Sequence, residues 1–234
     1  FFYVKDRPDQ VSWLSAKEKT YLTENYEKER EAMQRVKKYS VLKAFRDPKV
    51  LKLCLIYFLW VVGFWGFYFW MPTVLKELSG LSTSLLGGAI AIPMMAALIV
   101  QLIISKTATI TGDKVWHVFG TLFVGAVGLT LSPFASNLTI ALILVCLSAI
   151  GIHAAMGVWW TIPTTFLTGP AAAGSIALIN SCGNLGGWVG PNMMAWVKVT
   201  TGSFDLGYFI MGGAMLLSGL LVLTVKYNLF GKNR

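Results

Sequence analysis

The alternation of apolar and polar stretches divides the chain into a polar front and six long apolar segments. Residues 5–46 are polar, and beyond them apolar runs alternate with short polar interruptions. A helix needs about 20 predominantly apolar residues to cross a bilayer, and the six segments have about that length. The pattern predicts an all-α membrane protein, a six-transmembrane-helix bundle with spans at about 49–75, 85–105, 117–133, 138–163, 171–197 and 207–225.

The polar front predicts one charged helix. Ser15 is followed three residues later by Glu18, which is the signature of a capping box. The helix that it starts should run to about Lys38, with few apolar positions. We interpret it as a solvated linker helix, with a partner-binding helix as the less favoured alternative.

The first span has a clear predicted start. Asp47 can cap a helix N-terminus, and Pro48 suits the first helical position because its missing N–H would be unpaired there in any case. A short surface helix is expected just before it, over 40–45. The chain therefore divides into 1–46, the end of a preceding span plus a cytoplasmic linker, and 47–234, a six-helix C-terminal bundle.

Charge is scarce and unevenly distributed. The chain is 55% hydrophobic and 13% charged, whereas soluble domains carry about 25% charged residues. Thirteen of the 20 Lys and Arg, and eight of the 11 Asp and Glu, lie in residues 1–52. The net charge of +9 therefore belongs to membrane topology and does not indicate binding to nucleic acid.

The basic residues also predict an orientation. An even number of spans places both ends of the bundle on one side, and basic residues favour the cytoplasmic side. With residues 1–52 inside, only Lys76 and Lys198 remain outside. We expect a multi-pass protein with both ends in the cytoplasm.

The fifth apolar segment carries two asparagines, Asn180 and Asn184, one helical turn apart. Residues at i and i+4 share a helix face, and a bilayer offers their amides no water. The same segment contains the glycine pairs Gly183/Gly187 and Gly186/Gly190, a spacing that lets helices approach closely. We interpret the amides as part of a polar transport pathway, although a role in joining helices is about as well supported.

Aromatic residues supply further candidates. Tyr57 and Tyr68 in the first span combine an apolar body with a polar tip. Trp159 and Trp160 lie near the end of the fourth span, where they could form an interfacial belt or stack on a substrate. Spacing alone does not decide which of the two indoles faces a cavity.

A histidine and three prolines complete the candidates. His153 is the one ionisable residue predicted in mid-span, so it is a possible proton or polar site, although a structural hydrogen bond is the simpler role. Pro93, Pro163 and Pro191 interrupt backbone bonding and are possible bending points for gating.

The predicted bundle interior otherwise lacks buried carboxylates and guanidinium groups. Proton coupling requires a buried group that titrates, and anion carriers usually place a cation on the substrate. The chain alone therefore resembles one wall of a site whose charged wall lies on another segment. No metal-ligand pair, P-loop or nucleophile motif appears, so we predict neither an enzyme nor a cofactor.

Four passages resemble the C-terminal half of a major facilitator superfamily transporter. Within that superfamily, they are similar to the anion:cation symporter branch, which takes up tartrate, phthalate, galactonate and related acids. The passages are DRP…WLS within 2–15, GFYFWMP at 66–72, TGDKVWH at 111–117 and the segment 163–191 with ALINSCGNLGGWVGP. The resemblance covers essentially the whole chain and implies helices seven to twelve.

The resemblance also implies roles for residues. By position in the motif, Asn180 reaches the substrate from helix eleven, and Trp160 lines the cavity from helix ten. Asp113 and Lys114 belong to the cytoplasmic gating loop. That loop departs from the superfamily pattern, because 108–110 is Ala-Thr-Ile where an acid followed by a base is usual.

The function implied is transport of a small carboxylate or sugar acid with a proton, by alternating access, across the bacterial inner membrane. The expected partners are the lipid bilayer, the N-terminal six-helix half, the substrate and the proton. The alternative is a half-size membrane protein that pairs with or modulates a full-length carrier and does not transport alone.

Overall fold

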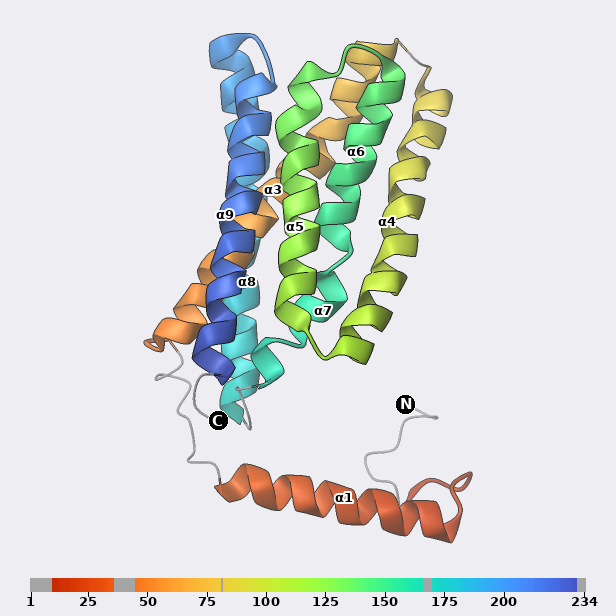
Figure 1. The fold of residues 1–234 in the computed structure, drawn as a ribbon, viewed down its shortest axis with the longest axis vertical. Helices are drawn as coiled ribbons and strands as arrows, with labels where there is room; N and C mark the ends of the chain where they lie inside the picture. Colours follow the sequence, from red (N-terminus) through yellow and green to blue (C-terminus); the bar gives the residue numbers. More distant parts are fainter. Residues whose placement is uncertain (1–9, 36–44, 81, 166–169, 231–234) are drawn as a thin grey trace.

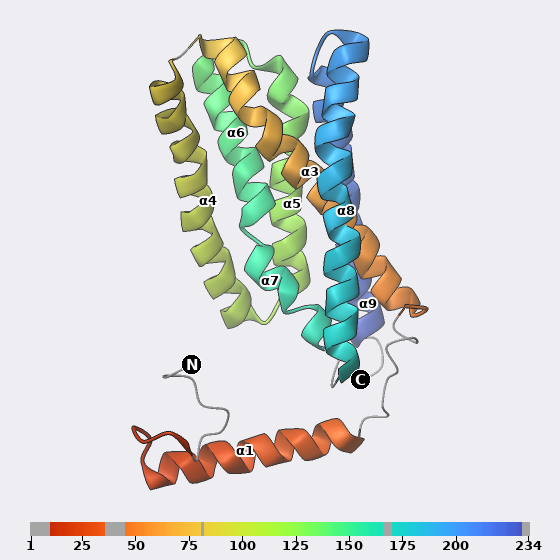
Figure 2. The ribbon, with the colours of Figure 1, turned by 180° about the vertical axis from the view of Figure 1, so that it is seen from behind.

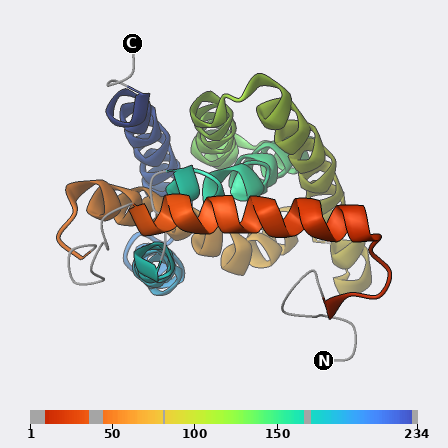
Figure 3. The same cartoon turned by 90° about the horizontal axis from the view of Figure 1, so that it is seen from below.

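A bundle of long helices stands above a separate charged helix in the computed structural model, which describes residues 10–35, 45–80, 82–165 and 170–230. In Figure 1 the helices from α3 to α9 stand side by side, and α1 lies across the end at which α3 begins and α9 ends. Seen from that end, α1 crosses beneath the bundle (Figure 3). The start of α3 and the end of α9 therefore lie on the same side of the bundle.

The charged helix α1 (Ala16–Arg35) begins at the predicted capping box. The Glu18 carboxylate accepts from the Ser15 backbone N–H at 2.9 Å and from its hydroxyl at 2.7 Å, and the Glu18 N–H donates to the Ser15 hydroxyl. The hydrogen bond from the Ser15 hydroxyl, followed by the one from its backbone N–H, lowers the pKa of Glu18. The expected surface helix over 40–45 and the end of a preceding span at 1–4 lie outside the described residues, apart from residue 45.

The first span is α3 (Pro48–Ser79), and it starts where the sequence predicts. The Asp47 carboxylate accepts from the backbone N–H of Lys49 at 2.8 Å, with Pro48 at the first helical position. Gly80 ends the helix in the left-handed conformation, with φ of 63°, and Gly112 does the same after α4 with φ of 68°. Such glycine C-caps avoid the steric penalty of a Cβ atom.

Five of the six predicted spans are long and apolar enough to cross a membrane, among the described residues. They are α3, α4 (Thr83–Thr111), α5 (Lys114–Leu131) with the short helix η2 (Ser132–Phe134), α6 (Leu138–His153) with α7 (Met156–Trp160) and η3 (Pro163–Thr165), and α9 (Asp205–Phe230). The sixth, α8 (Pro170–Thr201), has 32 residues like α3 but is not among them. Its glycines and asparagines make it less apolar. The all-α membrane fold is confirmed.

The helices α3 and α8 run in the same direction and cross each other (Figure 2), and they pack along a glycine seam. An added Cβ atom at Gly186 would lie 2.6 Å from the Phe58 carbonyl oxygen, and one at Gly190 would overlap the Val62 carbonyl oxygen. Here backbone meets backbone, as the glycine spacing predicts. Glycine also brings α5 and α6 together, where Gly125 and Gly151 touch through their backbones.

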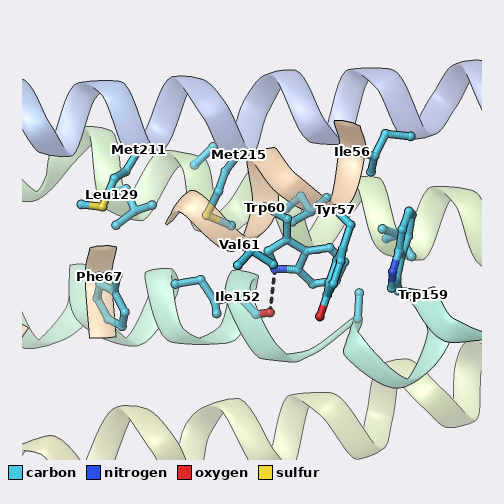
Figure 4. Packing of buried hydrophobic residues seen from close by; sticks show 14 of the residues in the cluster. Ile56, Tyr57, Trp60, Val61, Phe67, Leu129, Ile152, Trp159, Met211 and Met215 are labelled. Atoms are coloured by element: carbon cyan, nitrogen blue, oxygen red, sulfur yellow. Dashed lines mark hydrogen bonds between the residues drawn. The ribbon is translucent and has the colours of Figure 1, made fainter. Parts of the chain in front are cut away.

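The fourth span is not one continuous helix, which corrects the prediction for 138–163. A turn at 154–155 separates α6 from α7, eight residues before Pro163. The indole N–H of Trp60, on α3, donates to the Ile152 carbonyl at 3.0 Å beside this break (Figure 4). A buried carbonyl needs a hydrogen-bond partner. At Ile152 the turn interrupts the helical backbone hydrogen bonds, and the Trp60 indole supplies the partner instead.

Candidate functional site

The α8 helix presents different chemistry on its two sides. The glycine side lies against α3, while Asn180 and Asn184 are exposed on the remaining surface of the helix. The Asn184 amide donates to the Asn180 backbone carbonyl at 2.9 Å and to its side-chain oxygen at 3.0 Å. The two amides are thus joined as one polar patch, and the outer N–H groups of Asn180 stay available to a ligand.

Tyr57 connects this helix to the broken span. Its ring lies against Gly183, where a Cβ atom would overlap it, so the missing side chain on α8 makes room for the tyrosine. The same ring stacks on Trp159 with 5.9 Å between centroids, and Trp160 meets it edge-on at 5.1 Å. The structure therefore brings together three predicted site elements: the asparagine helix, Tyr57 and the Trp160 indole.

The choice between the two tryptophans follows from burial. Trp159 is fully buried, whereas Trp160 is half-buried and is the more accessible of the two indoles. The indole nitrogen of Trp159 has no hydrogen-bond partner among the described residues. Trp159 therefore supports the site from behind as the second face of the Tyr57 stack.

His153 ends α6 at the break and is enclosed by aromatic rings. Phe64 and Tyr68 of α3 meet its ring with centroid distances of 5.1 and 5.7 Å, both edge-to-face. Its Nε2 atom is buried and has no partner in the described part of the chain. Positions 57, 64 and 68 share one face of a helix, so a single face of α3 serves both the tryptophan pair and His153.

Tyr68 itself points toward another helix. Its hydroxyl donates to the Met94 sulfur of α4 at 3.0 Å. The predicted residues thus form two neighbouring groups along α3. One contains Tyr57 and Trp160, with Tyr57 against Gly183 of the asparagine helix, and the other contains His153 and Tyr68.

The prolines lie in different surroundings. Pro191 is inside α8, which continues through it, and its carbonyl accepts from the Trp70 indole at 3.0 Å. Pro93 is likewise inside a continuous α4. Pro163 is buried in η3, directly after the broken span. The backbone break therefore lies at a turn that contains no proline. Neither this break nor the hydrogen bond from Trp60 was predicted from the sequence. The only sequence signal of the break was the pair of glycines that flank it, Gly151 and Gly157.

Asp113 and Lys114 lie in the turn between α4 and α5. The Asp113 carboxylate caps α5 by accepting from the Trp116 N–H at 3.2 Å, and its backbone carbonyl contacts the His117 ring. The Lys114 ammonium donates to the Thr161 carbonyl at 3.3 Å. This contact ties the α4–α5 turn to the end of the broken span.

Amides, a phenol, indoles and a histidine line this region, and no carboxylate or Lys/Arg side chain belongs to it among the residues that the structure describes. A polar helix face beside a broken helix in a membrane bundle is typical of membrane transport proteins. The chain belongs to the major facilitator superfamily, whose family model matches residues 1–191.

Curated relatives give the same class. The chain is 38% identical over 225 residues to a putative tartrate transporter of Agrobacterium vitis, covering 96% of this chain and 52% of the relative. It is 32% identical over 227 residues to a quinolone resistance transporter of Acinetobacter baumannii, covering 97% and 52%. It is 30% identical over 229 residues to the inner membrane transport protein RhmT of Escherichia coli (strain K12), again covering 97% and 52%. The chain spans about half the length of the curated relatives it matches.

Proposed function

We propose that the chain is the C-terminal half of a secondary carrier that moves a small organic anion, a carboxylate or sugar acid, together with a proton. Two relatives are named putative tartrate transporters, at 38% and 36% identity. Tartrate, a hydroxylated dicarboxylate, is therefore the substrate to test first. Transport proceeds by alternating access, with two six-helix halves rocking about a site near the membrane midplane.

The observation that supports this proposal best is the division of α8 into a glycine side and an amide side. Packing against α3 uses Gly186 and Gly190, so Asn180 is not needed to hold the two helices together. Its amide can donate to a substrate carboxylate or hydroxyl group. Tyr57, which packs against Gly183 on the same helix, and Trp160 would supply an apolar surface for the carbon skeleton.

The charged part of the site is assigned to the N-terminal half. A dicarboxylate requires cationic or convergent donors, and a proton requires a group that titrates. His153 is the polar residue of this half that lies nearest to such a role, because its Nε2 is buried and unpartnered in the described chain. Residues 1–46 link the two halves on the cytoplasmic side of the inner membrane, with Asp113 and Lys114 at the same end as part of the inner gate.

The test is the substitution Asn180→Ala in the complete carrier, with tartrate uptake measured in proteoliposomes. Loss of a hydrogen bond to a charged group costs about 1.5–3 kcal/mol, so KM should rise about 10-fold or more. The matched control is Asn192→Ala. Asn192 is another exposed asparagine of α8, and its amide donates to the Trp188 carbonyl at 2.7 Å.

The proposal requires that Asn192→Ala leave KM within about twofold of the original value, because its amide is bonded within the helix. Both variants should insert into the membrane in equal amounts. An unchanged KM for Asn180→Ala, with normal insertion, would remove Asn180 from the site.

A further inference from the structure

A cavity with a mixed polar and apolar lining lies at the end of the bundle opposite α1, away from the α8 amides. Its volume is about 340 Å³, within the range of about 300–1,000 Å³ that is typical of small-molecule sites. It is lined by the ends of α3, α8 and α9, by η2 and by part of α6. In Figure 1 these elements meet at the top of the bundle. None of the predicted site residues lines it.

The charges around this cavity leave one carboxylate in excess. The Lys198 ammonium lies 3.4 Å from the Glu77 carboxylate and 4.4 Å from the centre of the Phe204 ring. Lys198 is therefore paired with Glu77, and only one cation faces the two carboxylates of the lining. The Asp205 carboxylate, in the first turn of α9, is exposed and pairs with no cation among the described residues. The lining thus favours a ligand that brings a positive group.

The hydroxyl of a tyrosine in the cavity wall gives an independent indication of a ligand. Tyr208 is only 5% exposed, lines the cavity, and lies one helical turn after Asp205. Its hydroxyl makes no hydrogen bond to another described residue. Because Tyr208 lines the cavity, this hydroxyl is available to bond a ligand atom there.

We propose that this cavity binds a zwitterion of the phosphoethanolamine type. The primary ammonium carries three N–H donors, which suit the Asp205 carboxylate and the Tyr208 hydroxyl. The phosphate would approach Lys198, whose ammonium has donors beyond the one given to Glu77. Apolar residues on the same wall, among them Val74, Leu78 and Val145, suit a carbon chain.

The ligand chemistry has two possible sources, a phosphatidylethanolamine headgroup or a free phosphoethanolamine. The position of the cavity, at the ends of membrane-crossing helices, is the level at which lipid headgroups lie. The experiment therefore uses both forms of the probe. It reads binding and not transport, so its outcome is separate from that of the substrate site.

The complete carrier is purified and incubated with equal amounts of phosphatidylethanolamine and phosphatidylcholine that have identical acyl chains, and the retained lipids are measured by native mass spectrometry. The trimethylated headgroup has no N–H donors, so we expect about fivefold or greater retention of phosphatidylethanolamine. Asp205→Asn and Tyr208→Phe should each reduce this preference towards unity, and the phenylalanine keeps the aromatic ring in place.

Lys76→Gln serves as the control, because Lys76 is exposed at the same end but does not line the cavity. It should retain the preference. A second arm titrates soluble phosphoethanolamine into the carrier. If soluble phosphoethanolamine binds and the Asp205→Asn variant loses this binding, the ligand is a free phosphoethanolamine. If the carrier prefers phosphatidylethanolamine but does not bind soluble phosphoethanolamine, the ligand is the lipid headgroup. Equal retention of the two lipids together with no binding of soluble phosphoethanolamine would overturn the proposal.

Discussion

The helices α8 and α4 are of similar length, yet they meet their surroundings in opposite ways. All four central glycines of α8 have an α3 atom where a Cβ would be added, whereas Gly87 and Gly88 of α4 have nothing within 4 Å. The most apolar window of α4 is only 11% buried. The more apolar helix is therefore the less enclosed one.

This difference reflects how helices associate in a bilayer. Lipid is as apolar as a leucine side chain, so apolarity alone does not drive one membrane helix onto another. Close packing and polar bonds do, and α8 has small residues on one side and amides on the other. The large exposed side chains of α4, such as Leu102 and Ile103, offer neither feature.

The largest effect is expected from Gly190→Ala. The added methyl group would overlap the Val62 carbonyl oxygen, which is backbone and cannot rotate away. Overpacking of this kind costs about 1–3 kcal/mol. Thermal unfolding of the chain in detergent micelles should show a clearly lowered midpoint. A midpoint equal to that of the unsubstituted chain would mean that the seam is looser than described.

A loss of comparable size is expected from Trp60→Phe, at the other contact of α3. The substitution removes the indole N–H and leaves the buried Ile152 carbonyl without its partner, at a cost of about 1–3 kcal/mol. Trp196→Phe is the matched control, because Trp196 is 62% exposed on α8. The same unfolding measurement should separate the two variants, and equal midpoints would contradict the role assigned to Trp60.

The smallest effect, with the opposite sign, is expected from Gly87→Ala. Open space surrounds this glycine, and alanine favours a helix over glycine by roughly 0.5–1 kcal/mol. The unfolding midpoint in micelles should rise slightly or stay the same. Destabilisation as large as that of Gly190→Ala would show that the contrast between α8 and α4 does not hold.

Much of the fold was predictable because local signals agree with it. Ser15 with Glu18, and Asp47 with Pro48, mark helix starts that depend only on neighbouring residues. The glycine spacing likewise predicted a close helix contact, although not that α3 would provide it. These features are encoded within a few residues of one another.

The broken span was not predictable, because its cause lies elsewhere in the chain. Ala154 and Ala155 favour helix, and the flanking Gly151 and Gly157 are only a weak signal of a turn. The bond that supports the turn comes from Trp60, 92 residues away. The different positions of Trp159 and Trp160 were unpredictable for the same reason. The two residues are adjacent in the sequence, and only their tertiary packing around Tyr57 distinguishes them.

The account depends most on the direction in which Asn180 faces. The direct measurement is Asn180→Cys in the complete carrier with its native cysteines replaced, labelled with a membrane-impermeant maleimide with and without tartrate. We predict that the cysteine is labelled without tartrate, because water reaches the site. We also predict that tartrate slows the labelling, because the substrate then occupies the site. Absence of labelling from either side of the membrane, with the protein folded and inserted, would place Asn180 against lipid and contradict the central claim.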